Sequence, residues 1–351
     1  MFIEDGYYMY KVTSSEERNE KATDFETKSM LYMMNYYSNS GNVEWFVIDF
    51  FNDVTGVNKL CTECYDIQSK GVKNIAPKQL GKYLVTLFKN YISEFNFSDY
   101  ILFVESVSST FLSQIGNKNV FFISDLLEDT QNAIYEGLEE ETKNKTYIDN
   151  DKITKENLVL FLKKVSVVID SHTKEEYVKD AVKLSADVII DDKILRKIFK
   201  EIRDKQSNKK NNNAEGHLIS SIGGFHKFDK HIKKEAIQDF IMNTICFKSA
   251  LLDFKSIPRS FQKFLNGYDE TIENDIIEDC QNAIFRLLHN KNNISAYWAL
   301  FSEVVKLIKS NPTDTIDDIY NKLDSQLITN TQYLDMISSK YYISLIKERI
   351  E

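Results

Sequence analysis

The order of apolar and polar positions in the first part of the chain predicts a helix followed by a β-hairpin. Residues 23–37 carry apolar side chains near the spacing of a helix. Residues 43–54 (VEWFVIDFFNDV) are rich in β-branched and aromatic side chains, which are typical of a strand. The sequence TGVN at 55–58 is typical of a turn, and residues 60–70 then return as a second strand.

The pattern continues with a further helix and three more strands. Residues 77–93 begin with proline and place their leucines on one side of a helix. Residues 100–106 (YILFVES) and 119–124 (NVFFIS) are short apolar runs that predict two buried strands, and 165–170 (VSVVID) predicts another. Most of the remaining chain after residue 124 has helical spacing, with the clearest apolar stripe at 297–308.

These elements predict an α/β N-terminal region, a mixed sheet flanked by helices, followed by a mainly α-helical C-terminal region. We expect a core at 1–125, a helical extension at 126–245 with a basic loop at 205–227, and a C-terminal helical region at 246–351. The chain has 351 residues, 42% of them apolar, enough to bury two ordinary cores. Its 3 prolines and 11 glycines are few for an all-β protein built from tight turns.

Composition favours a cytoplasmic protein without a membrane segment. No run of about 18 apolar residues occurs, and the first residues, MFIEDGYYMYK, include acidic side chains instead of an apolar signal core. Four cysteines, Cys61, Cys64, Cys246 and Cys280, are too few and scattered for a disulfide framework, so we expect reduced thiols. Cys61 and Cys64 form a CxxC, but no second pair follows at the spacing of a zinc ribbon.

The charge distribution contrasts one basic segment with an acidic chain. A net charge of −9 argues against a protein that coats nucleic acid nonspecifically. Residues 193–234 are the exception, with twelve Lys or Arg and four Asp or Glu. Their polar centre predicts a mobile basic loop, either a solvated linker or an arm along a phosphate backbone with Lys205, Lys209 and Lys210 as contacts.

Candidate chemistry lies on the predicted hairpin. Side chains alternate between the two faces of a strand, so Asp49 and Asp53 share a face of the first strand. By the same rule Asp66, Gln68 and Lys70 share a face of the second. Antiparallel pairing could bring these polar faces together, and burying such a cluster without a function would cost several kcal/mol. The alternative is an exposed hairpin face with a Lys–Asp ion pair.

The functional interpretation is a metal-dependent phosphodiesterase site. Phosphodiester hydrolysis requires a nucleophilic water, neutralisation of charge on the phosphate and help for the leaving oxygen. Asp53 could bind Mg²⁺ or Mn²⁺, which lowers the pKa of bound water and acts as a Lewis acid. Gln68 offers a neutral carbonyl oxygen and Lys70 a positive point charge.

At these residues the sequence resembles the PD-(D/E)XK nuclease superfamily. The predicted order of elements over 23–106 is similar to its restriction-endonuclease-like core of a helix, a hairpin carrying D and (D/E/Q)xK, another helix and a strand. FFNDV (50–54) and DIQSKG (66–71) resemble the double-stranded DNA endonuclease domain of bacterial anti-phage effectors, found in CBASS effectors and in the nuclease subunit of Lamassu systems. The resemblance is best over the first 125 residues.

The resemblance implies roles for individual residues. Asp53 matches the family's metal-binding aspartate, Gln68 the glutamine of its QxK, and Lys70 the catalytic lysine. Asp49 stands where the family often has an acid. The family's upstream helix usually shows a glycine-containing entry and an aromatic–glutamine pair, whereas TDFETK here offers Glu26 as the fourth metal ligand.

The resemblance also implies an activity and partners. We expect a Mg²⁺- or Mn²⁺-dependent endonuclease for double-stranded DNA that is the effector of an anti-phage or anti-plasmid defence system. Partner proteins of a defence complex, such as SMC-like proteins, would hold it inactive until it is released or forms homo-oligomers, with 246–351 as the docking region. Lys73 and Lys78 join the basic loop as DNA contacts. The alternatives are a noncatalytic DNA-binding or assembly subunit, and a nuclease for RNA or single-stranded DNA.

Overall fold

The chain forms two compact units. Unit 1 comprises Met1–Ala181 and Phe199–Ile237, and unit 2 comprises Val182–Ile198 and Gln238–Glu351. The fold is given by a computed structural model, which describes residues 2–4, 7–12, 20–182, 190, 192–247, 257–289 and 294–350.

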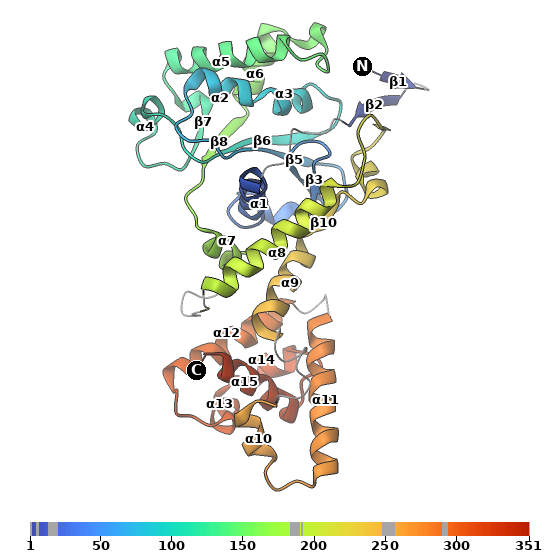
Figure 1. The fold of residues 1–351 in the computed structure, drawn as a ribbon, viewed down its shortest axis with the longest axis vertical. Coiled ribbons are helices and arrows are strands. Elements are labelled where there is room, and N and C mark those ends of the chain that lie inside the picture. Colours follow the sequence, from blue (N-terminus) through green and yellow to red (C-terminus); the bar gives the residue numbers. More distant parts are fainter. Residues whose placement is uncertain are drawn as a thin grey trace. The chain divides into compact units, whose positions relative to one another are not determined.

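Unit 1 is built on a mixed seven-stranded sheet (Figure 1). Its strands, in spatial order, are β10 (His231–Lys233), β3 (Val43–Ile48), β4 (Val54–Asn58), β5 (Cys64–Lys70), β6 (Phe97–Val104), β8 (Val165–Ile169) and β7 (Val120–Phe122). Strands β5, β6 and β8 are parallel, and the other neighbours are antiparallel. A smaller antiparallel sheet consists of β1 (Phe2–Glu4), β2 (Tyr7–Lys11) and β9 (Leu218–Ile219).

Helices cover both faces of the large sheet (Figure 1). One face carries α1 (Glu20–Asn35), with α7 (Lys174–Ala181) packed against it. The other carries α2 (Pro77–Tyr83), α3 (Val85–Tyr91), α5 (Glu128–Lys143) and α6 (Lys155–Leu162), and α4 (Ser109–Ile115) precedes β7. The mixed α/β sheet flanked by helices is confirmed.

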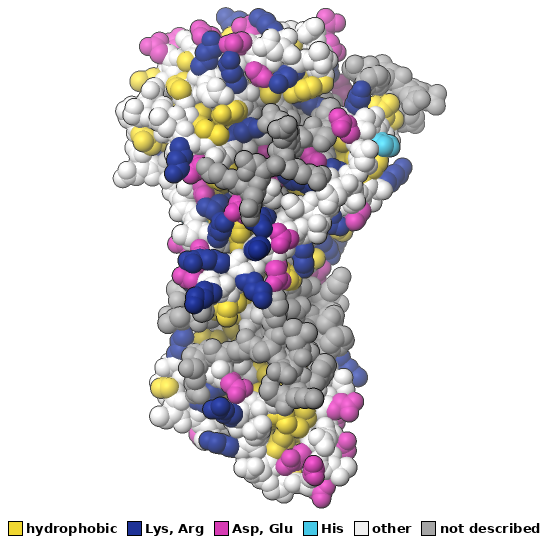
Figure 2. All heavy atoms as spheres, in the orientation of Figure 1, with side chains coloured by type: hydrophobic (Ala, Val, Ile, Leu, Met, Phe, Trp, Pro, Cys, Tyr) yellow, Lys and Arg dark blue, Asp and Glu magenta, His cyan; other side chains and the backbone are white. Residues whose placement is uncertain are grey.

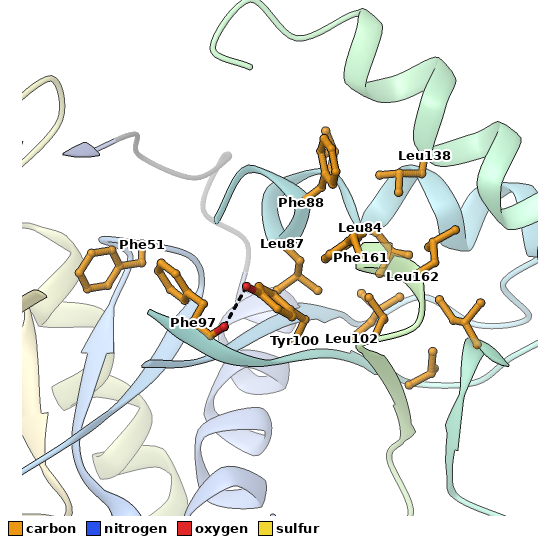
Figure 3. Close-up of a cluster of buried hydrophobic side chains, with 14 of the residues drawn as sticks. Phe51, Leu84, Leu87, Phe88, Phe97, Tyr100, Leu102, Leu138, Phe161 and Leu162 are labelled. Atoms are coloured by element: carbon orange, nitrogen blue, oxygen red, sulfur yellow. Dashed lines mark hydrogen bonds between the residues drawn. The ribbon is translucent and has the colours of Figure 1, made fainter. Parts of the chain in front are cut away.

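The main apolar core lies between the sheet and the α2, α3, α5 and α6 layer (Figure 3). Phe161 of α6 packs its ring 5.4 Å from the rings of both Phe88 and Tyr100. Helices α2 and α5 touch through their backbones, because a Cβ added at Gly81 would lie 2.0 Å from the carbonyl oxygen of Ile134. This packing fixes the layer behind the strand that ends in Lys70.

The predicted hairpin is wrong, because three antiparallel strands replace it. TGVN lies within β4, and the turns fall at 49–53 and 59–63. Gly56 packs closely against α1: a Cβ there would lie 2.5 Å from Sδ of Met33, so the Met33 side chain would have to shift. Asp49 and Asp53 consequently lie in the β3–β4 turn and not on one face of a strand, and Asp49 has the left-handed φ of 48° that the turn requires.

Most of the other elements agree with prediction. Residues 23–37 lie mainly in α1, which begins at Glu20; 77–93 form α2 and α3, with a break at Leu84. Residues 100–106 contribute to β6, and 165–170 form β8 inside the sheet. Residues 119–124 differ, because β7 is a three-residue edge strand that buries only Phe121.

The predicted mobile loop at 205–227 contains regular structure. Its first residues are the last turns of α8 (Asp192–Lys210), and β9 and a 3-10 segment (Ile222–Phe228) follow. Ile219, Ile222 and Phe225 are buried, and β9 and β10 pair with β2 and β3. The segment was predicted to be a mobile loop because most of its residues are polar, although these three apolar side chains pack into the core.

Unit 2 is helical, as predicted for the C-terminal region. Helix α9 (Lys234–Phe247) is followed by α10 (Arg259–Leu265), α11 (Glu270–His289), α12 (Ile294–Ser310), α13 (Ile316–Lys322), α14 (Ser325–Asn330) and α15 (Met336–Ile350). The predicted stripe of α12 is buried at Tyr297, Leu300, Phe301, Val304, Val305 and Ile308. Within the described ranges, no helix is both long and apolar enough to span a bilayer.

Candidate active site

The β3–β4 turn brings Asp53 against the carboxyl end of β5. The Asp53 Oδ2 atom accepts hydrogen bonds from Gln68 Nε2 at 2.6 Å, from the Ser69 backbone N–H at 2.9 Å and from the Ser69 hydroxyl at 3.0 Å. Asp53 is 6% exposed and Gln68 is 3% exposed. Burial raises the pKa of Asp53, while the charge of Lys70 and these hydrogen bonds act in the opposite direction.

Helix α1 supplies a second buried carboxylate, Glu26. Burial and, after it, the negative charge of Asp53 raise the pKa of Glu26 to about 7, against the opposing effect of an ion pair with Lys210. The charge of Asp53, from a separate element, thus disfavours the ionisation of Glu26. A cation between them would relieve that repulsion.

Asp49 is the third carboxylate of the cluster and is held by a different lysine. Lys230 Nζ donates to the Asp49 backbone carbonyl at 2.8 Å and to Oδ2 at 3.0 Å. The charge of Asp49 also contributes to the raised pKa of Glu26. A pocket of about 230 Å³ lies beside Asp49, Lys210 and Lys230, which leaves space for small ligands next to the cluster.

Lys70 is the last residue of β5 and is half-buried. Its Nζ lies 5.5 Å from the centre of the Tyr83 ring in α2, a cation–π contact that fixes the side chain beside the sheet. Burial raises the pKa of Asp53, and the charge of Lys70 is the largest of the effects that lower it. Asp53, Gln68 and Lys70 therefore meet at one end of β5, although Asp53 reaches it from a turn.

Asp66 shares the strand but has a structural environment. It is completely buried, and it accepts hydrogen bonds from Thr55 Oγ1 at 2.8 Å, Asn90 Nδ2 at 2.6 Å and Asn52 Nδ2 at 3.3 Å. Burial raises its pKa to about 6, and the three hydrogen bonds oppose the rise. Asp66 ties α3 and the β3–β4 turn to β5.

The donor set suits an oxygen-preferring divalent cation. Glu26, Asp49 and Asp53 offer carboxylates and Gln68 a carbonyl oxygen, the ligand types of Mg²⁺ and Mn²⁺. Within the described part of the chain, no three Asp, Glu, His or Cys side chains are already arranged around one cation position. Two carboxylates face lysines instead, so a metal would have to displace Lys210 or Lys230.

The predicted DNA-binding lysines fall into two groups. Lys73, Lys78 and Lys205 are exposed, with Lys73 and Lys78 in surface ion pairs with glutamates. Lys209 pairs with Asp229 at 2.6 Å, and Lys210 pairs with Glu26. Figure 2 shows basic side chains gathered over α8, where the exposed ones include Lys193, Arg196, Lys197 and Lys200.

The sequence analysis did not predict three residues of the site. Ser69 binds Asp53 partly through its backbone N–H, which no side-chain pattern reveals. Lys210 was predicted to contact DNA, and Lys230 was counted only as part of the basic segment. Their separation from Glu26 and Asp49 exceeds 180 residues along the chain, so only the fold shows these ion pairs.

The chain matches no protein-family model, no curated protein and no solved structure in the comparisons made.

Proposed function

We propose that unit 1 is a metal-dependent DNA endonuclease of the PD-(D/E)XK type. The observation that carries the proposal is the convergence of Glu26, Asp53, Gln68 and Lys70 at the end of β5, with two buried carboxylates whose pKa values are raised. Buried carboxylates with perturbed pKa values beside a lysine are typical of catalytic sites. The fold alone would not support an activity.

The element order supports a restriction-endonuclease-like core. Helix α1 precedes the antiparallel strands β3, β4 and β5, and α2 and α3 lead to β6, which is parallel to β5. This is the order that the resemblance implies, with a third strand where the sequence predicted a hairpin. Asp53 lies before the middle strand and Gln68 and Lys70 end the third.

Glu26, Asp53, Gln68 and Asp49 are the residues that would bind Mg²⁺ or Mn²⁺. When bound, the cation would supply Lewis acidity toward the phosphate and lower the pKa of a bound water. The Ser69 hydrogen bonds hold the Asp53 carboxylate in one orientation. Lys70 places a positive charge where negative charge would build on the phosphate in the transition state.

The basic contacts support a resting state that awaits activation. Lys210 and Lys230 neutralise Glu26 and Asp49, and both lysines are themselves largely buried. We propose, following the resemblance, that partner proteins of a defence system control the enzyme, whose helical unit 2 would provide the docking or oligomerisation surface. Double-stranded DNA would contact the exposed lysines.

Replacing Lys210 with glutamine is expected to raise the affinity for Mn²⁺ about tenfold, because an ion pair that competes with the metal is removed. Isothermal titration calorimetry at pH 8 measures this change. Lys205→Gln, an exposed position on the same helix, is the matched control and should leave the affinity unchanged. An unchanged or weaker affinity in Lys210→Gln would show that Lys210 does not compete with the cation.

The test of the proposed function is cleavage of plasmid and linear double-stranded DNA by the full chain. We expect cleavage with Mg²⁺ or Mn²⁺, none with EDTA, and none for Asp53→Asn, alone or with the proteins encoded beside it. Parallel reactions with RNA and single-stranded DNA identify the substrate. If no nucleic acid is cut under any of these conditions, the endonuclease proposal fails.

The ion pairs of Lys210 and Lys230 also favour the second candidate, a noncatalytic DNA-binding or assembly subunit. In that case these lysines would be permanent structural partners of the carboxylates. Asp53→Asn would then keep every cellular function of the chain, whereas removal of the exposed basic residues of α8 would abolish it.

A further inference from the structure

A second pocket in unit 1 lies apart from the carboxylate cluster. It has a volume of about 450 Å³ and is bounded by β2, the segment that follows α3, and residues 146–152. This volume is in the range of small-molecule binding sites. None of its lining residues belongs to the candidate active site.

A buried amine forms part of the wall. Lys89 is 8% exposed, and its Nζ donates a hydrogen bond to the Tyr10 hydroxyl at 2.9 Å. Burial lowers the pKa of Lys89 to about 7, although the charge of Asp66 acts in the opposite direction. A buried ammonium is costly for the fold, and such residues are often retained for binding or catalysis.

The rest of the lining includes aromatic and basic side chains together with two acids, Glu94 and Asp149. The rings of Tyr10 and Phe95 stack with centres 5.4 Å apart, and Tyr147 adds a 43% exposed ring. Lys11 and Lys152 add positive charge, and Lys152 pairs with Glu94 at 3.3 Å. Planar walls beside a buried cation suit a ligand that has a ring and a negative charge.

We propose that this pocket binds a small planar anion, with the anionic group at Lys89 and the ring against Phe95 and Tyr147. An aromatic carboxylate and a nucleoside monophosphate share this chemistry. Both fit the volume and the combination of aromatic and basic lining residues.

A chain of buried hydrogen bonds leads from this pocket toward β5. The Tyr10 hydroxyl donates to Asn90 Oδ1 at 2.7 Å, and Asn90 Nδ2 donates to Asp66 Oδ2 at 2.6 Å. Asn90 and Asp66 are both completely buried. A ligand that moves Lys89 or Tyr10 therefore acts on the residue that anchors β5.

The same chain continues to the candidate metal ligand. Asn52 Nδ2 donates to Asp66 Oδ2 at 3.3 Å, and Asn52 Oδ1 accepts from the Asp53 backbone N–H at 3.0 Å. The pocket and the β3–β4 turn thus share one hydrogen-bonded network. This step rests on the proposed function, because it assumes the metal site at Asp53. We expect the ligand to change the affinity of the protein for Mn²⁺ at least threefold, and Mn²⁺ to change the affinity for the ligand by the same factor.

The test is calorimetric titration of the full chain, without DNA or metal, with four probes: AMP, benzoate, adenosine and inorganic phosphate. We expect AMP or benzoate to bind with a Kd below about 1 mM, and adenosine and phosphate to bind at least tenfold more weakly. Binding of AMP alone identifies a phosphate ligand, and binding of benzoate alone a carboxylate. Absence of binding by both would overturn the proposal.

Two variants locate the binding site. Lys89→Met, which keeps most of the unbranched side chain and removes the amine, is expected to weaken binding at least tenfold, whereas the exposed Lys118→Met should not. If Lys89→Met fails to fold by circular dichroism, Phe95→Leu removes a ring and no charge, and should weaken binding of AMP and benzoate but not of inorganic phosphate. Unchanged binding in the folded variants would overturn the site.

The Mn²⁺ titration is then repeated with saturating ligand. Equal Mn²⁺ affinities with and without ligand would overturn the coupling. If the protein binds the ligand but cuts no nucleic acid, the pocket proposal holds and the proposed nuclease function fails.

Discussion

Replacing Lys70 with methionine is expected to lower metal-dependent DNA cleavage by about 10³-fold, because a charge positioned for the transition state is lost. The affinity for Mn²⁺ should change little, since Lys70 contributes no metal ligand. Methionine preserves most of the apolar stem that packs toward Tyr83. The expected result is therefore a folded protein that binds metal and DNA but does not cut.

The measurement is single-turnover cleavage of a labelled duplex at saturating Mn²⁺, with Mn²⁺ binding followed by calorimetry. Lys59→Met, an exposed position in the β4–β5 turn, is the matched control and should cleave normally. Equal cleavage by Lys70→Met and wild type would remove Lys70 from the chemistry. Loss of both cleavage and Mn²⁺ binding would instead make Lys70 an organiser of the metal site.

The sequence predicted the position of the candidate site better than the path of the chain through it. The strand predicted at 60–70 is observed as β5, which contains Gln68 and ends at Lys70. The turn was misplaced because Gly56 is typical of turns in sequence, yet here it serves the close contact with Met33. That contact depends on how α1 packs on the sheet, and the residues next to Gly56 in the sequence do not reveal this packing.

The basic segment shows a second limit of sequence interpretation. Its charge count suggested contacts with a phosphate backbone, and five basic residues of α8 are exposed: Lys193, Arg196, Lys197, Lys200 and Lys205. Lys210 and Lys230 instead lie against buried carboxylates. Composition gives the total charge of a segment, whereas the partner of each charge depends on tertiary structure.

Asp53 and Asp66 illustrate how two aspartates in similar sequence settings acquire different roles. Asp53 has its three hydrogen bonds on one oxygen, Oδ2, and it lies close enough to Glu26 to raise the pKa of that carboxyl. The bonds of Asp66 involve both oxygens and come from Thr55 and two asparagines. We infer that Asp53 serves the chemistry and Asp66 the stability of the site.

Asp66→Ala is therefore expected to lower the free energy of unfolding of unit 1 by about 3–5 kcal/mol, because it leaves buried donors of Asn52, Asn90 and Thr55 without their acceptor. Asp66→Asn should cost less than about 1 kcal/mol. Its amide oxygen can keep both asparagine donors, and its NH₂ can donate to the Thr55 hydroxyl, which accepts as well as donates.

Urea unfolding followed by tryptophan fluorescence measures both variants. The chain has two tryptophans, Trp45 in β3 of unit 1 and Trp298 in α12 of unit 2, so a Trp298→Phe background reports on unit 1. Asp53→Asn is the control and should unfold near the wild-type midpoint while losing cleavage. Equal destabilisation by Asp66→Ala and Asp66→Asn would mean that the charge matters and not the hydrogen bonds. Destabilisation by Asp53→Asn as large as that of Asp66→Ala would make both aspartates structural and favour the noncatalytic subunit.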